Sequence, residues 1–530
     1  MHVDIVIVGS GVAATSVAQR LLDHDPKRSI LLLEAGPKIK TKDFALWENY
    51  LITNRLPYDG CRDLDYPQKD QPGENISAGG TEVPLNGARL VAYGGSTLHW
   101  GGWSFRLKPE DFSLFSNTGQ GADWPITYAD LEPYYCEAEH YLGVSGDSAD
   151  RIVPRSRGYP FVRFPFTLQD RPLADALDKL QLPYSHVPIA REGIGAVHSR
   201  RAPCHSTGTC KYCPFGARYA ATNALNDMLA WEDYPNLQVV SGAVVEKVTL
   251  AGTHRAAGVQ YRDVATDGMF EVTAELVIIA AGTIESAKLL QRSTTAEWPN
   301  GIGNRTDHVG RHFVTHPYFV FSAQLDSNPL ALQPEMNFPT LCSRHYDSPA
   351  EQKAGKYILV NPPDTVNPLL VRNMQQGKTR AQIDDIVKGP SKVQIHGMIE
   401  VFGKPSNLVK NSIDLNRFGL YQTIVDYTKD PGFDARMDEI DTAVDAIFAV
   451  MGATPAGKPS VSWRADHAGS TCRMSTDEAS GVVDANLLVH GMDNLYVCSN
   501  AVFPSIGAIN PTLTLTALSL RLGDYLGKPA

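Results

Sequence analysis

The chain has 530 residues, of which 43% are hydrophobic and 20% charged, as in an ordinary globular protein. Its length exceeds that of one ordinary domain and predicts two intertwined domains. The net charge of −10 and the lack of a Lys/Arg run argue against a nucleic-acid surface. No apolar stretch approaches the roughly 18 residues that a membrane helix requires, so no membrane span is expected.

The N-terminus carries a dinucleotide-binding pattern. A β-rich apolar run, Val3–Val8, is followed at once by Gly9, Gly11 and Ala14 in the spacing G-x-G-x-x-A, where alanine replaces the third glycine. Gly9 permits the tight turn, and Gly11 lets a pyrophosphate approach the N-terminus of a helix that begins near Val12.

A second apolar strand, Ser29–Leu33, ends in Glu34, roughly twenty residues beyond the glycines. An acidic side chain at this distance binds the ribose hydroxyls of an adenosine group. The order of strand, glycines, helix, strand and acid therefore predicts a dinucleotide site, whereas the glycines alone would also fit a purely structural turn.

Two further segments favour a flavin over a nicotinamide cofactor. The glycine-rich loop Tyr93–Gly102 contains a His-Trp pair, and the strand Leu276–Ala280 runs into a small-residue turn and a helix. Both suit a close approach of backbone to an extended cofactor, while a second G-x-G-x-x-G for a nicotinamide dinucleotide is not seen. The predicted contacts from these segments are Gly94, Gly95, Ser96, His99, Trp100, Ala281 and Gly282.

The C-terminal region supplies candidate catalytic residues, His467 and Asn510. An alcohol that releases a hydride must also lose its O–H proton, and a neutral imidazole accepts that proton well near neutral pH. Asn510 would hydrogen-bond the same substrate oxygen, and Pro511 is expected as the first residue of a closing helix with the apolar run Leu513, Leu515, Leu518 and Leu522. The alternative is that His467 is a satisfied buried histidine and Asn510 an N-cap.

With these motifs the chain resembles the glucose-methanol-choline (GMC) oxidoreductases, a family of FAD-dependent alcohol oxidases and dehydrogenases. Asp123–Tyr128 and Leu142–Gly146 are similar to segments of bacterial sugar and polyol dehydrogenases and of pyranose oxidases. The resemblance implies that His467 is the catalytic base with Asn510 as its partner. It also implies cofactor contacts from Asn500, where relatives usually carry Asp, and from Ala501, Pro511 and Thr512.

The same resemblance implies an α/β fold. A Rossmann-like FAD-binding domain would be interleaved with an α+β substrate domain built on an antiparallel sheet. We expect residues 1–110, 195–310 and 460–530 in the FAD-binding domain, and 111–194 and 311–459 in the substrate-binding domain. Within the latter, Gln324–Asp384 is rich in Pro and Asn and is expected to form a loop or lid. His316, Gln394 and Glu400 are candidates either for substrate contact or for structure.

His99 has two interpretations. In pyranose oxidases a histidine in a similar loop is covalently attached to the flavin, whereas related dehydrogenases need not have this bond. We expect His99 to lie near the flavin and leave the covalent bond open.

Three of the eight cysteines, Cys204, Cys210 and Cys213, lie within ten residues and end in Cys-Pro. This run resembles iron–sulfur ligand segments, including the 3Fe–4S segment of the glucose and fructose dehydrogenase branch, although the last spacing is one residue shorter. The alternatives are plain thiols or a local disulfide, and a zinc site that would require a fourth ligand. The other cysteines, Cys61 among them, are scattered and are expected to be inert thiols.

The predicted reaction is the oxidation of a hydroxyl of a sugar, glycoside or polyol to a carbonyl by hydride transfer to FAD. A dehydrogenase that passes electrons to a small subunit or a cytochrome is favoured, because Trp124–Gly146 resembles that branch. The alternatives are an oxygen-using sugar or alcohol oxidase and, in another class, a non-catalytic flavin-fold binding subunit. Because the first strand begins at Val3, a cytoplasmic protein without a signal peptide is expected, with periplasmic co-export by a partner as the alternative.

Overall fold

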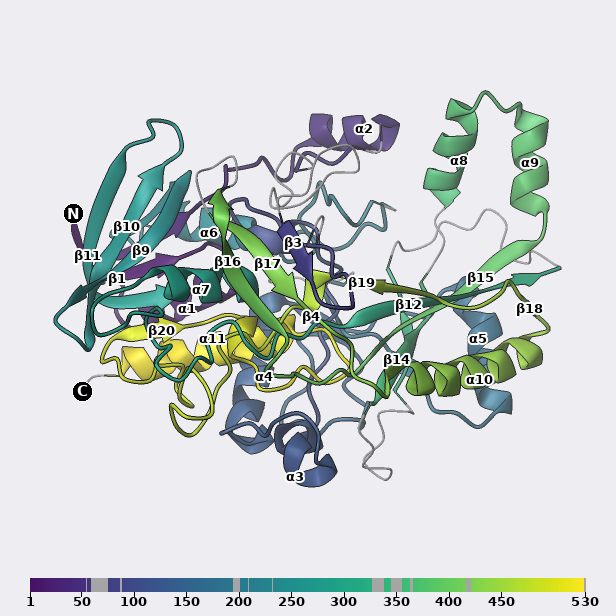
Figure 1. The fold of residues 1–530 in the computed structure, drawn as a ribbon. Helices are drawn as coiled ribbons and strands as arrows, with labels where there is room; N and C mark the ends of the chain where they lie inside the picture. The colour runs from purple at the N-terminus through teal and green to yellow at the C-terminus, as the bar shows by residue number, and fades with distance from the viewer. Residues whose placement is uncertain are drawn as a thin grey trace.

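The structure is a computed structural model of the chain. It describes residues 1–53, 55–58, 75–85, 88–193, 201–207, 209–230, 232–326, 338–344, 355–362, 366–415 and 421–528. Two large sheets dominate the molecule, one at the end that holds both termini and one at the opposite end (Figure 1). This mixed α/β architecture confirms the predicted fold class.

The first sheet has the strand order β8-β2-β1-β11-β10-β9, and β20 pairs with the end of β11. β8, β2, β1, β11 and β20 run parallel, whereas β9, β10 and the start of β11 form an antiparallel meander. Strands at the centre of such a sheet are buried on both faces, which explains their unbroken apolar runs. The bounds are β1 His2–Val8, β2 Ile30–Glu34, β8 Leu237–Ser241, β9 Ala243–Ala251, β10 Arg255–Asp263, β11 Met269–Ile279 and β20 Leu495–Val497.

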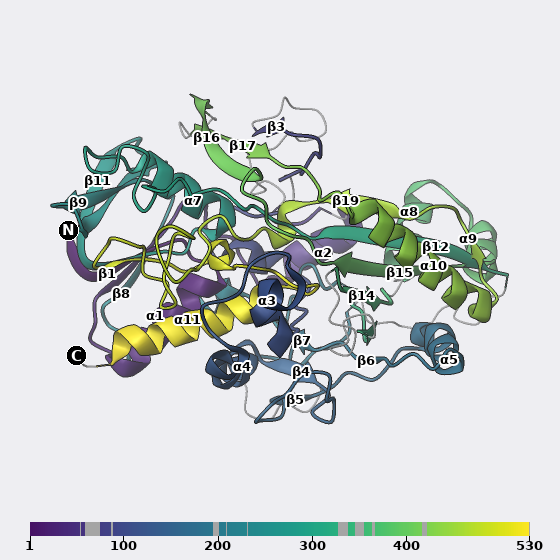
Figure 2. The ribbon, with the colours of Figure 1, turned by 60° about the horizontal axis from the view of Figure 1, so that its bottom comes forward.

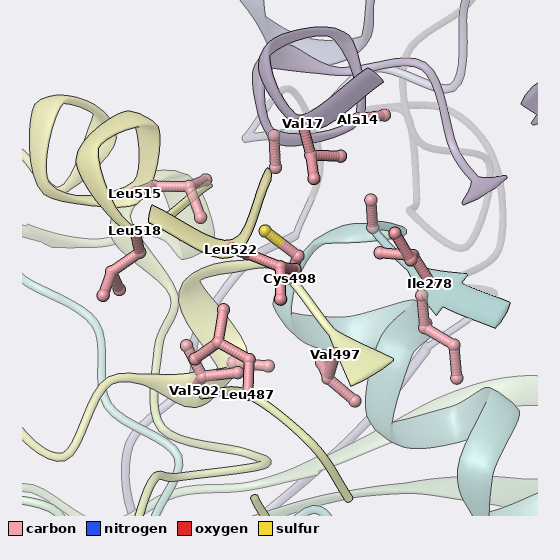
Figure 3. Close-up of a cluster of buried hydrophobic side chains, with 14 of the residues drawn as sticks. Ala14, Val17, Ile278, Leu487, Val497, Cys498, Val502, Leu515, Leu518 and Leu522 are labelled. Atoms are coloured by element: carbon pink, nitrogen blue, oxygen red, sulfur yellow. The ribbon is translucent and has the colours of Figure 1, made fainter. Parts of the chain in front are cut away.

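Helices from the two ends of the chain pack together beside this sheet. α1 (Val12–His24) and α11 (Thr512–Gly527) lie side by side in both views (Figures 1 and 2). Figure 3 shows the core between them and the sheet, where Val17, Ile278, Val497 and Leu518 are almost completely buried. The predicted apolar face of α11, Leu513, Leu515, Leu518 and Leu522, is buried as expected. The other helices near this sheet are α4 Tyr128–Leu142, α6 Ala221–Ala230 and α7 Gly282–Arg292.

The start of α11 differs by one residue from the prediction. The helix begins at Thr512, and Pro511 takes the cap position. The reason is that the Pro511 carbonyl accepts the first helical hydrogen bond, from the Leu515 amide at 2.9 Å, which is the role of a capping residue.

The second sheet is antiparallel throughout its described strands, in the order β18-β12-β15-β14-β13-β6, with β19 also paired to β12. Along β12 alternate residues are buried, as expected for a strand with one face on a core. That core contains Phe319 and Phe321 and is completed by α5 and α10. The bounds are β6 Ser185–His186, β12 Pro317–Leu325, β13 Leu341–Ser343, β14 Tyr357–Val360, β15 Ser391–Ile399, β18 Thr454–Pro455, β19 Ser460–Trp463, α5 Arg171–Lys179 and α10 Phe433–Met451.

The prediction of a long loop over Gln324–Asp384 is wrong. The segment holds the end of β12, the strands β13 and β14, the helix α8 (Val366–Gln375) and the start of α9 (Arg380–Lys388). β13 and β14 span only 3 and 4 residues, too few to show a period, and they are stabilised by pairing with distant strands.

Two smaller sheets and two helices complete the described elements. β3 pairs with β17, and β17 with β16, while β4 pairs with β5 and β7. β3 and β17 come from opposite sides of the expected domain boundaries, as do β12 and β19, and the proposed domain division stays a prediction. The bounds are β3 Asn75–Ala78, β16 Leu408–Leu415, β17 Tyr421–Asp426, β4 Val144–Gly146, β5 Phe161–Val162, β7 Ile189–Ala190, α2 Phe44–Thr53 and α3 Leu114–Thr118.

Candidate active site

A cavity of about 770 Å³ opens at the carboxyl ends of β1, β2 and β11. In open α/β sheets this edge is where ligands bind. The wall also contains Arg464–Ala468, from the segment that follows β19 of the second sheet. The cavity therefore joins the end of the first sheet with a segment that follows the second sheet, and its lining comes from both ends of the chain.

The glycine turn after β1 has the shape of a cofactor cradle. Gly9 has φ +106°, and a Cβ there would lie 2.6 Å from the Ala280 carbonyl oxygen, so only glycine fits. Gly11 lines the cavity, and a Cβ on it would meet no atom within 4 Å. The space in front of Gly11, at the N-terminus of α1, is thus open for a phosphate group, and Gly282 at the start of α7 is equally open.

Glu34 ends β2 at the wall of the cavity with 6% of its surface exposed. Ser10 Oγ donates to its Oε2 at 2.5 Å, and the Gly36 amide donates to its Oε1 at 2.8 Å. Burial raises the pKa of Glu34 to about 7 despite these two hydrogen bonds. A buried carboxylate beside the glycine turn fits the recognition of ribose hydroxyls.

The glycine-rich loop forms another part of the wall. Gly95, Ser96, His99 and Trp100 line the cavity, whereas Gly94 lies behind it. Gly94 has φ +94°, and a Cβ there would lie 2.0 Å from Thr222 Oγ1. Gly94 therefore fixes the loop against α6, and its amide donates to Ser10 Oγ at 2.9 Å.

His467 and Asn510 meet at the same wall. Asn510 Nδ2 lies 3.1 Å from His467 Nε2, although 43 residues separate them in the chain. On the other side of the ring, His467 Nδ1 lies 3.1 Å from Nδ1 of His316, which is 3% exposed. Burial, then the nearby His316 and Arg464, hold the pKa of His467 well below its usual range.

The segment around His467 adds residues that sequence reasoning did not single out. Arg464 and Asp466 line the cavity and form an ion pair of 2.5 Å, and Trp103 lines it beside Trp100. Burial raises the pKa of Asp466 to about 6, although the Arg464 guanidinium opposes this shift. The available signals were the position of Asp466 next to His467 and of Trp103 directly after the glycine-rich loop.

Asn500 Oδ1 and Asn510 Oδ1 are buried at the cavity wall and have no hydrogen-bond partner among the described residues. Unsatisfied buried oxygens of this kind are rare and fit a site that is completed by a ligand. With the cradle at Gly11 and the carboxylate at Glu34, the residues present fit a flavin dinucleotide.

Several predicted residues do not reach the cavity, and others do. Ala281, Gly282 and Thr512 line it, whereas Ala501, Pro511 and Ala14 do not. Ala14 is fully buried in the core between α1 and the sheet (Figure 3). Gln394 and Glu400 are also outside the lining and take structural contacts, with Ser322 Oγ and the Gly355 amide respectively.

The three clustered cysteines lie behind the cavity wall. Cys204, Cys210 and Cys213 share an apolar cluster with Trp103, whose ring also lines the cavity. Nη1 of the buried Arg191 lies 3.8 Å from Cys204 Sγ. Every cysteine in the described residues is a free thiol, so the local disulfide is not formed there, and Cys61 lies outside these residues. Among described residues no group of three His, Cys, Asp or Glu is arranged to hold a metal ion.

Within the described part of the chain, no helix combines the length and apolar character needed to cross a bilayer. Comparison with known proteins finds the two GMC oxidoreductase family models, one over residues 190–318 and the other over 410–519.

The relatives extend this similarity over the whole chain. The fructose dehydrogenase large subunit of Gluconobacter japonicus is 27% identical and matches 99% of this chain and 98% of that protein. The 6'''-hydroxyparomomycin C oxidase of Streptomyces lividus is 28% identical over 98% of this chain and 90% of that protein. A formate oxidase from Aspergillus oryzae, studied for modification of its FAD, shares the fold with a TM-score of 0.66 and 16% identity, over 99% of this chain and 97% of that one. The chain belongs to the GMC oxidoreductases, FAD-dependent enzymes that oxidise CH–OH groups of sugars and alcohols.

Proposed function

We propose that this enzyme oxidises a hydroxyl of a sugar, glycoside or polyol to a carbonyl, with His467 as the base, and that it is a dehydrogenase. The observation that carries the proposal is the pairing of His467 Nε2 with Asn510 Nδ2 at the wall of the cavity that also contains Gly11 and Glu34. A proton acceptor and a dinucleotide cradle thus share one enclosed space.

The residues that would hold FAD follow from the cavity wall. Gly11 and the N-terminus of α1 would receive the pyrophosphate, and Glu34 the ribose hydroxyls. The N-terminus of α11 reaches the wall at Thr512, beside Asn510, where its positive dipole end favours negative charge. Bound FAD supplies the two-electron acceptor for the hydride that leaves the substrate carbon.

His467 receives the hydroxyl proton in this mechanism. Because burial lowers its pKa, the ring is neutral at neutral pH and has a free lone pair on one nitrogen. The substrate hydroxyl would replace the Asn510 amide as the hydrogen-bond partner of Nε2. Its O–H bond breaks as the proton moves to Nε2, and the Asn510 Nδ2–H then donates to the same substrate oxygen. The hydrogen bond from Asn510 holds the substrate oxygen in place while negative charge develops on it.

The polar and aromatic wall supports a hydroxyl-rich substrate. Trp100 and Trp103 offer flat apolar faces, and the Arg464–Asp466 pair offers charged donors and acceptors next to His467. A pocket with apolar faces and a few charged groups discriminates polyhydroxylated molecules from simple alcohols, because each unmatched polar group would remain unsatisfied.

The dehydrogenase assignment is supported by the fructose dehydrogenase large subunit among the relatives, whose name also implies a partner subunit. An acceptor such as a small subunit or a cytochrome would then take the electrons. The oxygen-using oxidase is the second candidate, and the paromomycin-type oxidase among the relatives favours it.

An iron–sulfur cluster at Cys204, Cys210 and Cys213 would provide the route to such an acceptor. Against it stands the finding that no three His, Cys, Asp or Glu side chains of the described residues are arranged to hold a metal ion. Nη1 of the buried Arg191 lies 3.8 Å from Cys204 Sγ, and its Nε and Nη2 have no hydrogen-bond partner among the described residues, so a negatively charged group near these thiols would satisfy them. Covalent attachment of FAD to His99, which lines the cavity, is a separate proposal, tested by whether flavin absorbance stays with the denatured polypeptide.

The test of the function is anaerobic reduction of the bound flavin by a panel of sugars, glycosides, polyols and simple alcohols, followed by admission of oxygen. Bleaching by a sugar or polyol and slow reoxidation by oxygen but fast reoxidation by a quinone or a dye is the expected result. Fast reoxidation by oxygen would identify an oxidase instead. A flavin that no member of the panel reduces would favour the non-catalytic binding subunit.

A further inference from the structure

His467 is the middle member of a hydrogen-bonded chain that runs from the cavity into the core. Asn510 Nδ2 contacts His467 Nε2 at 3.1 Å, and His467 Nδ1 contacts His316 Nδ1 at 3.1 Å. The other nitrogen of His316, Nε2, contacts the Gly507 carbonyl oxygen at 2.7 Å. The two imidazole rings are nearly perpendicular, at 85°.

The direction of every bond in this chain is fixed by its buried end. The Gly507 carbonyl can only accept, so His316 Nε2 must carry the proton. Burial lowers the pKa of His316 to about 4, so the ring is neutral and its Nδ1 is an acceptor. His467 must then donate from Nδ1, which leaves the lone pair on Nε2, the nitrogen beside Asn510.

The backbone around the two histidines holds this arrangement. Val314 and Gly469 exchange amide–carbonyl hydrogen bonds of 3.3 and 2.9 Å, and the hydroxyl of Thr315 donates to the Arg464 carbonyl. The segments around His316 and His467 are therefore tied to each other. Gly507 has φ +57°, and a Cβ there would lie 2.7 Å from Leu107 Cδ2, so a glycine is needed to aim its carbonyl at His316.

No carboxylate of the described residues is hydrogen-bonded to either ring. The charged groups nearest to His467 are Arg464, which disfavours its protonation, and Asp466, which pairs with Arg464. In many enzymes a carboxylate orients the catalytic imidazole and selects its tautomer. Here a neutral imidazole occupies that place.

We propose that His316 is a positioning residue that selects the Nδ1–H tautomer of His467 and so keeps the lone pair on Nε2, where the Asn510 amide donates in this structure and where the substrate hydroxyl would bind. The inference rests on the proposed function, in which His467 is the base. When the substrate O–H bond breaks and the N–H bond forms at Nε2, the Nδ1–H of the resulting imidazolium still donates to His316. A neutral partner stabilises this cation through one hydrogen bond and adds no permanent negative charge to the site.

The test compares His316→Phe, which keeps a ring but removes both nitrogens, with His316→Asn, whose Oδ1 can replace the Nδ1 acceptor. The control is His396→Phe, which removes a half-buried histidine from the second sheet, one that pairs with Tyr318 and is outside the cavity lining. The readouts are bound FAD, melting temperature and the pH dependence of the rate of flavin reduction.

We expect His316→Phe to bind FAD and to reduce it roughly 10- to 100-fold more slowly, the usual effect of removing a group that orients a histidine. The fall of its rate at acid pH should also shift from the wild-type position, because His316→Phe removes both the acceptor of the Nδ1–H and a neighbour that lowers the pKa of His467. His316→Asn should recover most of the rate, and His396→Phe should keep the wild-type rate and limb.

A wild-type rate and acid limb in His316→Phe would overturn the inference while leaving the base intact. If the proposed function itself were wrong and His467 were not the base, the flavin of His467→Ala would also be reduced at the wild-type rate. Should His316→Phe not fold, ¹⁵N spectra of histidine-labelled wild-type protein decide the matter. The signal that disappears in His467→Ala must show a protonated Nδ1 and an unprotonated Nε2, and the reverse pattern would overturn the proposal.

Discussion

The Nδ2 atom of Asn510 lies 3.1 Å from Nε2 of His467, and both side chains face the cavity that begins at the glycine turn after β1. The fold thus brings together the segments of His467 and Asn510, neither of which indicates a function by itself. The amide holds the imidazole from the cavity side, and its Oδ1 has no hydrogen-bond partner. This pair is the part of the site from which the chemical predictions start.

Replacement of His467 by alanine should lower the rate of flavin reduction by roughly 10²- to 10⁴-fold, because the substrate proton loses its acceptor. FAD should remain bound, since the cradle at Gly11 and Glu34 is untouched. Stopped-flow absorbance under anaerobic conditions measures the rate. Reduction at a near-normal rate would exclude His467 as the base.

The pH profile of flavin reduction should have an acid limb below pH 6.5. Burial lowers the pKa of His467, with a smaller contribution from His316 and Arg464, so the folded ring stays neutral to lower pH than free histidine. Only the neutral ring accepts a proton, and therefore the rate falls as pH decreases through this lowered pKa. A limb centred above pH 7 in the reduction rate would contradict the assignment.

Gly11→Val should abolish flavin binding, because the new side chain would fill the open space in front of the helix N-terminus. The matched control is Gly80→Val, at a glycine where a Cβ also meets nothing within 4 Å but which lies outside the cavity lining. The ratio of flavin to protein absorbance in each purified variant measures the effect. Full flavin content in Gly11→Val would show that this turn is not the cofactor cradle.

Asp466→Asn should weaken the binding of polyhydroxylated substrates more than that of a simple alcohol. The loss of one charged hydrogen bond costs about 1.5 to 3 kcal/mol, which corresponds to an increase of roughly 10- to 100-fold in Kd. The comparison uses substrate concentration series for flavin reduction with a sugar and a short primary alcohol. An equal change for both substrates would mean that Asp466 does not recognise additional hydroxyls.

The sequence was sufficient for the parts of the molecule that depend on local pattern. The β1-α1-β2 unit with Glu34 at its end, and the apolar face of α11, follow from periodicity and from a turn that only glycine allows. The pairing of His467 with Asn510 was predicted from the resemblance to the family, and the structure has the two side chains in contact.

The features that the sequence did not predict, such as the contact between His316 and His467, depend on pairing between distant segments. His316 reaches His467 because Val314 pairs with Gly469, a contact that no local pattern encodes. Arg464 and Asp466 reach the cavity because β19 pairs with β12 and the chain then turns back toward the first sheet. The short strands β13 and β14 are stabilised by pairing with distant strands. The local sequence does not show these partners, and its Pro and Asn residues therefore predicted a loop.

The last prediction concerns the exit of electrons from the flavin. Cys204, Cys210 and Cys213 lie in one apolar cluster with Trp103, which lines the cavity, and Cys204 Sγ lies 3.8 Å from Nη1 of the buried Arg191. If they bind an iron–sulfur cluster, anaerobically purified protein should contain iron and acid-labile sulfide, and Cys210→Ser should lose both. Cys342→Ser, at a buried thiol outside this cluster, is the matched control and should retain them.

The flavin of Cys210→Ser should still be reduced by substrate, because the base and the cradle lie on the cavity side of Trp103, but electron transfer from this flavin to a cytochrome should be slow. Wild-type protein without iron would eliminate the cluster, and oxygen would then become the favoured acceptor of the reduced flavin.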